Sequence, residues 1–243
     1  MKLTPITPIL LASTLGMTSN VLAEEATTDK KLWSGEVSVT FISNNGNTRS
    51  QNMGLKSRAV RDGELWRSTY KLEGSNESTD DERTAEKYFG SVKFDRKLSD
   101  VSYVFGLLEH EDDSFSGYDY QTSLSAGYGR KLINTDAHKL EMEVGPGYRR
   151  SVTEEEHDVE NEATLRGAAN YDWAIDKTSS FRQEVSVESG EESTISKSLS
   201  RYKKQLNGSL SLTLSYEVKH TSKVPSGTDK SDSTTAVALD YSF

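Results

Sequence analysis

Apolar and polar side chains alternate along most of this chain. From Trp33 to Phe41 the odd positions are apolar or glycine, while the even positions between them are Ser, Glu or Thr. A period of two is typical of β-strands, because successive side chains of a strand point to opposite faces of its sheet. The pattern is clear in nine segments, which are 33–41, 88–94, 101–107, 120–128, 140–148, 165–173, 181–187, 210–218 and 237–243. Three weaker segments, 49–60, 64–72 and 194–203, bring the predicted number of strands to about twelve.

The connections between these segments alternate in length. Short turns are predicted at 61–63, 96–100, 134–138, 176–179 and 205–208. Longer polar loops are predicted at 73–86, 109–119, 151–162, 188–193 and 220–233, and the first connection on that side, 43–47, is tight. Short turns on one side and long loops on the other are typical of outer-membrane barrels, in which an even strand number returns both chain ends to the periplasmic side. We therefore predict an all-β fold, a single transmembrane antiparallel up-and-down β-barrel of about twelve strands.

The composition is compatible with such a barrel. Hydrophobic residues make up only 33% of the 243 residues, and the formal net charge is -9. No run of about 18 uncharged apolar residues occurs, which excludes a membrane protein built from helices. A barrel strand needs only about 9–11 residues with alternate side chains facing lipid, so half of each strand can be polar.

The N-terminus predicts export. Lys2 precedes an apolar stretch from Leu3 to Leu15, and Val21-Leu22-Ala23 is followed by two glutamates. This is the pattern of a secretory signal peptide cleaved after Ala23, so the predicted domains are a signal peptide at 1–23 and an outer-membrane barrel at 24–243. The sequence has no cysteine, which fits an exported protein without disulfides and excludes thiol chemistry and cysteine metal sites.

Aromatic residues fall near the ends of the predicted strands, on their apolar faces. If the first strand rises from the periplasm, they form two rims, as in membrane barrels. The periplasmic set is Trp33, Trp66, Phe94, Tyr103, Tyr128, Trp173, Phe181, Tyr241 and Phe243, and the outer set is Phe41, Tyr88, Tyr120, Tyr148 and Tyr216. The chain closes with the alternating apolar residues Val237, Leu239, Tyr241 and Phe243. A terminal Phe is the signal that barrel-assembly machinery reads, so the predicted partners are this machinery during insertion, then outer-membrane lipid and lipopolysaccharide.

Several short motifs are spread over nearly the whole predicted barrel. They are Trp33-Ser34-Gly35-Glu36-Val37, Asn45-Gly46-Asn47-Thr48, Asp112 to Tyr120, Ala126-Gly127-Tyr128-Gly129, Gly145-Pro146-Gly147-Tyr148-Arg149 and Leu239-Asp240-Tyr241-Ser242-Phe243. Through these motifs the chain resembles the domain-of-unknown-function 481 family of salt-induced outer-membrane proteins, and the stretch 112–149 is the most specific part. The resemblance implies a barrel in the outer membrane and brings no activity or ligand with it.

Four glycines are predicted on the lumen face of two neighbouring strands. They are Gly127, Gly129, Gly145 and Gly147. Glycine removes a side chain, so these positions could form a smooth groove in the lumen wall. The other interpretation is strand curvature, or the close approach of a large side chain or a neighbouring segment.

No motif in the sequence predicts catalysis. The histidines are His110, His138, His157 and His220, and His138 lies in a turn on the opposite side of the membrane from the others. No Ser–His–acid set recurs in one strand register, and no phosphate-binding loop precedes a helix. We therefore expect no enzyme activity, no cofactor and no metal site.

Acidic residues are concentrated in three predicted outer loops, which carry seventeen of the 38 acids. The candidate cation-attracting residues are Asp112, Asp113, Glu154, Glu155 and Glu156. These loops either remain solvated and oppose aggregation, or gather cations at the mouth of the barrel. A nucleic-acid partner is excluded by this sign of charge.

The predicted lumen face carries charges of both signs. The set is Lys56, Arg58, Arg67, Lys71, Lys87, Lys93, Glu141, Glu143, Arg149, Arg166, Asp172, Arg182, Glu184, Glu188, Glu217 and Lys219, while Lys197 falls on an apolar face without explanation. About eight strands leave a filled interior and 16–18 leave a channel, so twelve strands do not decide between them. The leading hypothesis is a narrow pore for small polar solutes or ions, or an envelope protein used under salt or osmotic stress. The alternatives are a closed barrel that acts through its acidic outer loops, and a soluble periplasmic β-protein.

Overall fold

The computed structural model describes residues 32–44, 50–79, 82–113, 116–154, 157–225 and 228–243. The predicted signal peptide, with its cleavage after Ala23, lies outside these residues. The described strands are β1 (Trp33–Asn44), β2 (Ser50–Asp62), β3 (Trp66–Thr79), β4 (Glu82–Lys97), β5 (Ser102–Asp113), β6 (Tyr118–Asn134), β7 (His138–Thr153), β8 (Val159–Ala174), β9 (Ser179–Gly190), β10 (Thr194–Gln205), β11 (Leu210–Thr221) and β12 (Ser231–Ser242). The predicted all-β fold with twelve strands is confirmed.

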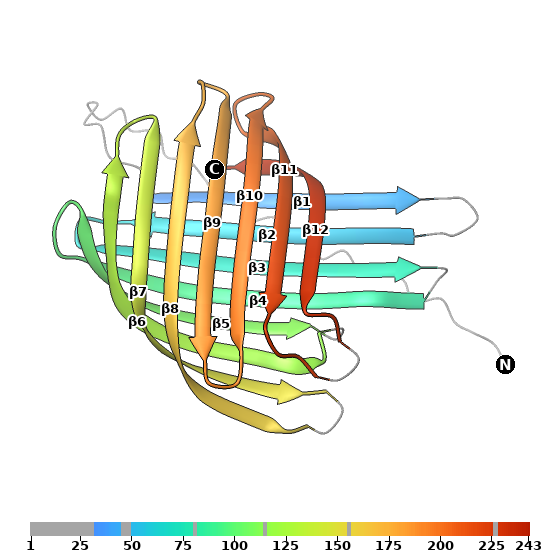
Figure 1. The fold of residues 1–243 in the computed structure, drawn as a ribbon. Helices are drawn as coiled ribbons and strands as arrows, with labels where there is room; N and C mark the ends of the chain where they lie inside the picture. Colours follow the sequence, from blue (N-terminus) through green and yellow to red (C-terminus); the bar gives the residue numbers. More distant parts are fainter. Residues whose placement is uncertain (1–31, 45–49, 80–81, 114–115, 155–156, 226–227) are drawn as a thin grey trace, which may run out of the picture. The chain divides into compact units, whose positions relative to one another are not determined.

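The strands form one closed antiparallel barrel (Figure 1). Each strand pairs with the next along the chain, and β12 pairs with β1 to close the ring. At this closing seam, Gly35 and Phe243 exchange two backbone hydrogen bonds of 3.0 Å. We call the end of the barrel that holds Trp33 and Phe243 the terminal end, and the opposite end the distal end. No helix long and apolar enough to cross a membrane occurs in the described part of the chain.

The barrel bends where two glycine-rich strands touch. In Figure 1, β1–β4 run across β9–β12 at a steep angle, while β6–β8 curve from one direction toward the other. The regular pairing of β6 with β7 is interrupted between Ser125–Gly147 and Tyr128–Val144. A Cβ at Gly127 would lie 2.2 Å from the Val144 carbonyl oxygen and 2.7 Å from the Gly145 Cα. The two backbones therefore approach here more closely than any side chain allows.

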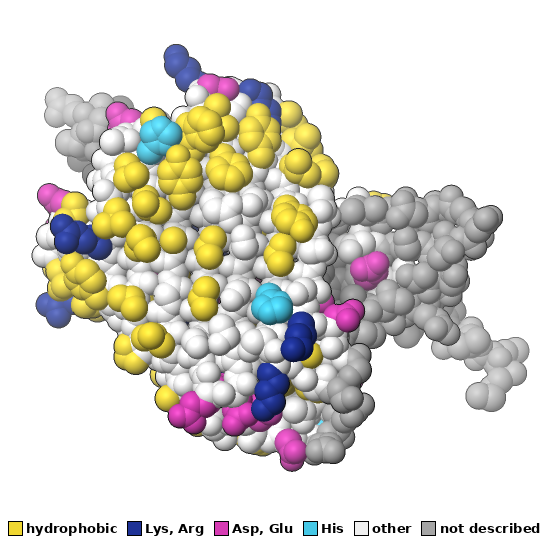
Figure 2. Space-filling view, in the orientation of Figure 1, with side chains coloured by type: hydrophobic (Ala, Val, Ile, Leu, Met, Phe, Trp, Pro, Cys, Tyr) yellow, Lys and Arg dark blue, Asp and Glu magenta, His cyan; other side chains and the backbone are white. Residues whose placement is uncertain are grey.

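Large apolar side chains are gathered on the outer surface of the barrel. Large hydrophobic side chains that point outward stay about half exposed, such as Phe41 at 63% and Leu214 at 51%. Figure 2 shows them spread over the face formed by β7–β12, with charged side chains toward both ends of the barrel. At the terminal rim, Trp33 stacks on Tyr70, whose ring meets Phe94 edge-on, both at 6.3 Å. Polar side chains fill the interior instead, which is the reverse of a soluble protein and typical of a membrane barrel.

Two strands face the opposite way from the prediction. Tyr103, Phe105 and Leu107 of β5 were expected on the apolar outer face, but all three are buried inside the barrel and form its apolar cluster. The apolar outer positions of β5 are instead Val104 and Leu108. Both faces of this strand carry apolar residues, so alternation alone could not tell which face points inward.

In β10 the unexplained Lys197 points into the lumen, where it binds Glu111. Ile195 and Leu199 share its face and line lumen cavities. The face of β10 that was predicted to be its apolar outer face is therefore its lumen face. The cation, and not the two aliphatic residues, identifies the inner face.

The strands are also longer at the distal end than predicted. Strand β3 extends to Thr79 and β4 begins at Glu82, so most of the predicted loop 73–86 is paired strand. Asp112 and Asp113 likewise belong to β5. Strands that continue beyond an apolar band keep their backbone hydrogen bonds but lose the apolar alternation by which they were recognised.

Candidate functional site: the charged lumen

The lumen is lined by paired charges. Of the sixteen charged residues predicted to face the lumen, fifteen form ion pairs within the described part of the chain, and Arg58 is the exception. Several pairs join strands on opposite sides of the ring, such as Lys71 of β3 with Glu184 of β9 at 2.9 Å and Lys219 of β11 with Glu111 of β5 at 2.5 Å. Side chains from opposite walls therefore meet inside the barrel.

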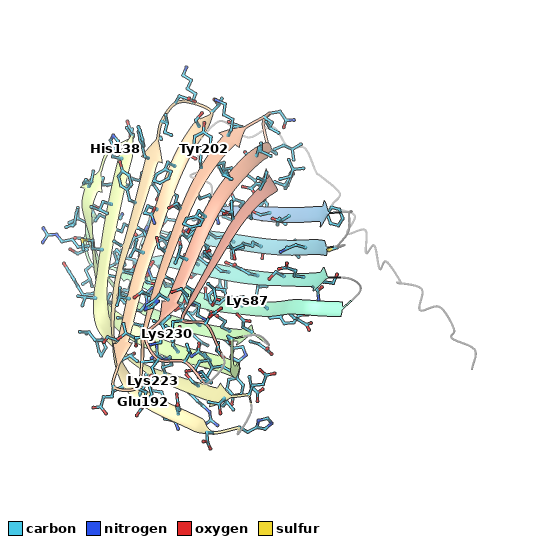
Figure 3. All side chains as sticks on the ribbon, turned by 45° about the vertical axis from the view of Figure 1, so that its right-hand side comes forward. Lys87, His138, Glu192, Tyr202, Lys223 and Lys230 are labelled. Atoms are coloured by element: carbon cyan, nitrogen blue, oxygen red, sulfur yellow. The ribbon has the colours of Figure 1, made fainter. Side chains whose placement is uncertain are left out.

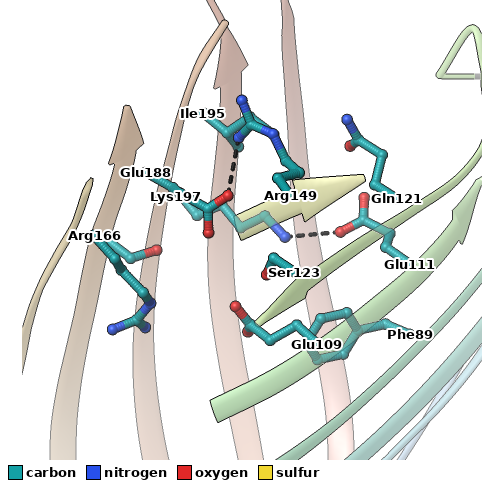
Figure 4. Close-up of a pocket in the computed structure, with 11 residues that line it drawn as sticks. Phe89, Glu109, Glu111, Gln121, Ser123, Arg149, Arg166, Glu188, Ile195 and Lys197 are labelled. Atoms are coloured by element: carbon teal, nitrogen blue, oxygen red, sulfur yellow. Dashed lines mark hydrogen bonds and ion pairs between the residues drawn. The ribbon is translucent and has the colours of Figure 1, made fainter. Parts of the chain in front are cut away.

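In the distal half, three lysines converge on one buried carboxylate. The Nζ atoms of Lys219, Lys197 and Lys87 lie 2.5, 2.7 and 3.2 Å from the Glu111 carboxylate oxygens. Glu111 was predicted to lie in an acidic outer loop, but it belongs to β5 and is only 6% exposed. Figure 4 shows Lys197 reaching Glu111 from the opposite wall, with Phe89 beneath it at 5.4 Å from the ring centroid.

A second distal cluster is built around Arg149, which is 2% exposed. Its Nη2 donates to Glu162 Oε1 at 2.5 Å and to the carbonyl oxygen of Ser193 at 2.7 Å, and its Nη1 donates to Glu188 at 3.1 Å. The backbone N–H of Glu192 donates to the other oxygen of Glu162 at 2.9 Å. This guanidinium thus ties β7, β8 and β9 to the turn that begins β10. Arg149 is the last residue of the motif Gly145 to Arg149, so its hydrogen bonds explain why an arginine stands at that position of the motif.

The terminal half holds a network between β3, β4, β5, β7 and β8. Arg67 makes a forked pair of 2.9 Å hydrogen bonds to Glu141 and donates to Asp95 at 2.6 Å. Lys93 bonds to Glu143 and lies 3.0 Å from Asp95. The Tyr103 hydroxyl donates to Glu143 at 2.8 Å, and the Arg67 guanidinium lies 5.0 Å from the centre of its ring. These contacts with charges of both signs explain why Tyr103 points into the lumen, although it was predicted to face lipid at the periplasmic rim.

The other side of the terminal half carries charges that the sequence reasoning missed. Glu36 of β1 accepts a hydrogen bond from Arg201 at 2.8 Å and another from Lys203, both from β10. None of the three was assigned to the lumen, because Glu36 is isolated on its strand and the face of β10 was inverted. Arg182 of β9 donates to Asp172 of β8 at 2.5 Å, as expected for two predicted lumen residues.

Four adjoining cavities of the described lumen extend from the terminal end to the Glu111 cluster. Two at the terminal end each have a volume of about 330 Å³, and two toward the distal end have volumes of about 120 and 50 Å³. Neighbouring cavities share walls: the terminal two share Arg58 and Arg182, the next two share Arg166 and Glu184, and the distal two share Phe89 and Lys197. The smallest of these four cavities, with a volume of about 50 Å³, lies beside Glu111 and Arg149 (Figure 4).

The residues of the predicted acidic loops differ in their surroundings in the structure. Asp112 and Glu154 are exposed, while Asp113 lies 3.8 Å from Lys87. Glu155 and Glu156 lie outside the described residues. Other acids of the predicted loops point inward, because Glu73 pairs with Lys56 and Glu162 with Arg149. Fewer free carboxylates than the predicted seventeen therefore surround the distal mouth.

The described distal loops contact one another. A Cβ at Gly117, which has a positive φ of 77°, would lie 2.5 Å from Thr228 Oγ1, so the β5–β6 connection touches the β11–β12 connection. Lys223 donates to Glu192 at 2.9 Å (Figure 3). This hydrogen bond lowers the pKa of Glu192 and raises the pKa of Lys223.

The four predicted groove glycines are covered by neighbouring atoms. Gly127 and Gly145 face each other's backbones, and a Cβ at Gly129 would lie 2.3 Å from the Tyr103 ring. A Cβ at Gly147 would lie 2.7 Å from Ser125 Oγ. The geometry thus favours close approach and curvature over an open groove.

The residues of the predicted assembly signal all point outward and are half exposed. They are Val237, Leu239, Tyr241 and Phe243. The Phe243 ring lies over Gly35, where a Cβ would come within 2.2 Å of it.

Among the described residues no group of His, Cys, Asp and Glu could hold a metal ion. His138 instead donates to or accepts from the Tyr171 hydroxyl at 2.8 Å and stacks on Tyr171 at the terminal rim.

Known proteins are similar to this chain in sequence or in fold. The model of the family described as "Protein of unknown function, DUF481" matches residues 37–243. The uncharacterized protein YdiY of Escherichia coli (strain K12) is 30% identical over 216 residues, which cover 88% of this chain and 84% of YdiY. The NanC porin is similar in structure, with a TM-score of 0.51 and 11% identity over 86% of this chain and 98% of that protein. At that identity the likeness to NanC concerns the fold, which is that of a small outer-membrane porin.

Proposed function

Because the chain belongs to the DUF481 family and folds as a porin-like barrel, we propose that it is an outer-membrane pore for small polar solutes or ions. The observation that carries this proposal is the series of adjoining cavities, which share walls from the terminal end to the Glu111 cluster. Paired charges of both signs keep these walls polar, and polar cavities of this size hold water. A route for small solutes across the outer membrane suits an envelope under osmotic load.

The distal constriction should set the conductance of this pore. Phe89 and Lys197 line both distal cavities, whose volumes are about 50 and 120 Å³. The Phe89 side chain forms no hydrogen bond or ion pair, so its truncation should widen the passage at the expense of one cation–π contact with Lys197, while the Lys197–Glu111 pair stays in place. Lys197, in contrast, holds Glu111 and cannot be removed without leaving that carboxylate short of a partner.

Single-channel recording in planar bilayers tests the proposal. Refolded barrel, verified by its changed gel mobility on boiling, should give discrete conductance steps, and Phe89→Ala should enlarge them. Leu214→Ala, which shortens an outward-facing side chain on β11, is the matched control and should leave the steps unchanged. Folded protein that gives no steps, with or without Phe89→Ala, would refute the pore.

A second candidate function, a closed barrel that acts through its outer surface, has one observation in its favour. Ion pairs such as Lys71–Glu184 and Lys197–Glu111 cross the lumen, and loop residues Gly117 and Thr228 meet at the distal end. If these contacts close the barrel, the wild-type protein should be silent in bilayers and the exposed distal acids should carry its function. The same recordings therefore separate the two candidates.

A further inference from the structure

A cavity of about 330 Å³ at the terminal end is lined by more cations than acids. The cations are Arg58 of β2, Arg182 of β9, and Arg201 and Lys203 of β10, and the acids are Glu36 and Asp172. Hydroxyl-bearing residues Ser34, Ser180 and Ser242 complete the polar lining. The cavity is therefore a polar chamber with an excess of positive charge.

The acids of this chamber are already engaged. Glu36 accepts hydrogen bonds from both Arg201 and Lys203, and Asp172 accepts one from Arg182 at 2.5 Å. Two further acids lie close by. Glu184 is held by Lys71 at 2.9 Å, and the buried Asp240 accepts a hydrogen bond from Thr213 at 2.6 Å.

Arg58 is left without a partner in the described part of the chain. Its side chain points into the two large terminal cavities, and its buried Nε has no hydrogen-bond acceptor. Its charged surroundings include Arg182 and Arg201 as well as Glu184 and Asp172, whose oxygens bind other cations. A half-buried guanidinium without an acceptor is costly, because its desolvation is not offset by hydrogen bonds.

We propose that this chamber binds a small oxyanion, a carboxylate or phosphate group, through the guanidinium of Arg58. A guanidinium presents a planar fork of N–H donors that matches the two oxygens of such a group. Arg182, Arg201 and Lys203 add positive charge around it, and a chamber of about 330 Å³ admits a small organic anion. That the anion passes through the barrel rests on the pore proposed above, whereas its binding does not.

Binding can be measured on the refolded barrel in neutral detergent, without conduction. Thermal unfolding is followed while sodium phosphate or sodium acetate replaces sodium chloride at constant ionic strength. Both anions, or one of them, should raise the melting temperature saturably, and Arg58→Gln should weaken the apparent affinity about tenfold or more. Arg61→Gln, on the same strand but exposed, is the matched control and should bind as the wild type does.

The variant also reports on folding. In chloride alone Arg58→Gln should be as stable as the wild type or more so, because it removes an unpaired guanidinium.

A response to phosphate but not acetate would identify phosphate groups as the ligand, and the reverse would identify carboxylates. Equal responses of the Arg58 and Arg61 variants, or no saturable response of the wild type, would overturn the site. Anion binding without conductance would leave the site standing and refute the pore.

Discussion

Substitution of two glycines on β6 should distinguish close approach to backbone from close approach to an aromatic ring. At Gly127 the added methyl group meets the Val144 carbonyl oxygen at 2.2 Å, and at Gly129 it meets the Tyr103 ring at 2.3 Å. An ordinary contact between carbon and oxygen is about 3.3 Å or longer, so each neighbour must move by roughly 1 Å. Backbone in a paired strand cannot move without breaking its ladder, whereas a ring can turn. We therefore expect Gly127→Ala to lower the free energy of unfolding by at least about 3 kcal/mol, and Gly129→Ala by about 1–3 kcal/mol.

Gly167 on β8 gives the control, because a Cβ there meets nothing within 4 Å. Gly167→Ala should be neutral or add about 0.4–1 kcal/mol through the unfolded chain. Urea unfolding of the refolded barrels in lipid vesicles, followed by tryptophan fluorescence, measures all three. If Gly127→Ala and Gly167→Ala unfold at the same urea concentration, the close contact between β6 and β7 is not what requires glycine.

Three further outcomes are expected. Arg149→Gln should lower the free energy of unfolding by about 3–5 kcal/mol in the same urea assay, because it leaves the buried Glu162 carboxylate without its guanidinium partner. Adding Glu162→Gln should recover part of that loss, and a double variant less stable than the single one would contradict this. Since the Lys223 hydrogen bond lowers the pKa of Glu192, its stabilising effect is present above the unfolded pKa of a glutamate and disappears as the pH falls through the lowered value. Backbone hydrogen exchange in the described part of 222–230, corrected for intrinsic rates, should then be faster in acid for the wild type. The Glu192→Gln variant should exchange fast at every pH. Identical pH profiles of the two proteins would show that the Lys223–Glu192 hydrogen bond does not stabilise this loop. Phe243→Ala should reduce the amount of barrel in outer-membrane fractions and hardly change the melting temperature, because the ring is half exposed, and equal amounts in cells would count against an assembly role.

The sequence predicts the barrel well because its signal is repeated in every strand. Alternation assigns residues to two faces, and twelve repetitions make the number of strands robust to weak segments such as 49–60. Alternation fails to identify the inner face of a strand where both faces are similarly apolar. In β5 the inner Phe105 and the outer Leu108 are equally apolar, and the deciding fact, the charged partners of Tyr103, comes from other strands.

The pairing of the lumen charges could not be predicted for a related reason. Lys56 and Glu217 are 161 residues apart and meet only because the barrel closes. Strand alternation placed both in the lumen but carries no information on which walls face each other. The acids were misplaced for a simpler reason, since Glu111 and Glu162 lie in strand extensions that are polar on both faces and so look like loops.

The outer face of β10 sets a condition on how the barrel enters a bilayer. With its register established, the outward positions of this strand include Ser196, Ser198 and Ser200, so it offers hydrocarbon little apolar surface. The hydroxyls of Ser198 and Ser200 are satisfied by the side-chain amide of Gln183 on β9, at 3.0 and 2.6 Å. Unpaired, each of these groups would be costly in hydrocarbon. Strand β10 would lose these two side-chain hydrogen bonds if it entered the apolar layer apart from β9, so we expect the two strands to insert as a joined hairpin.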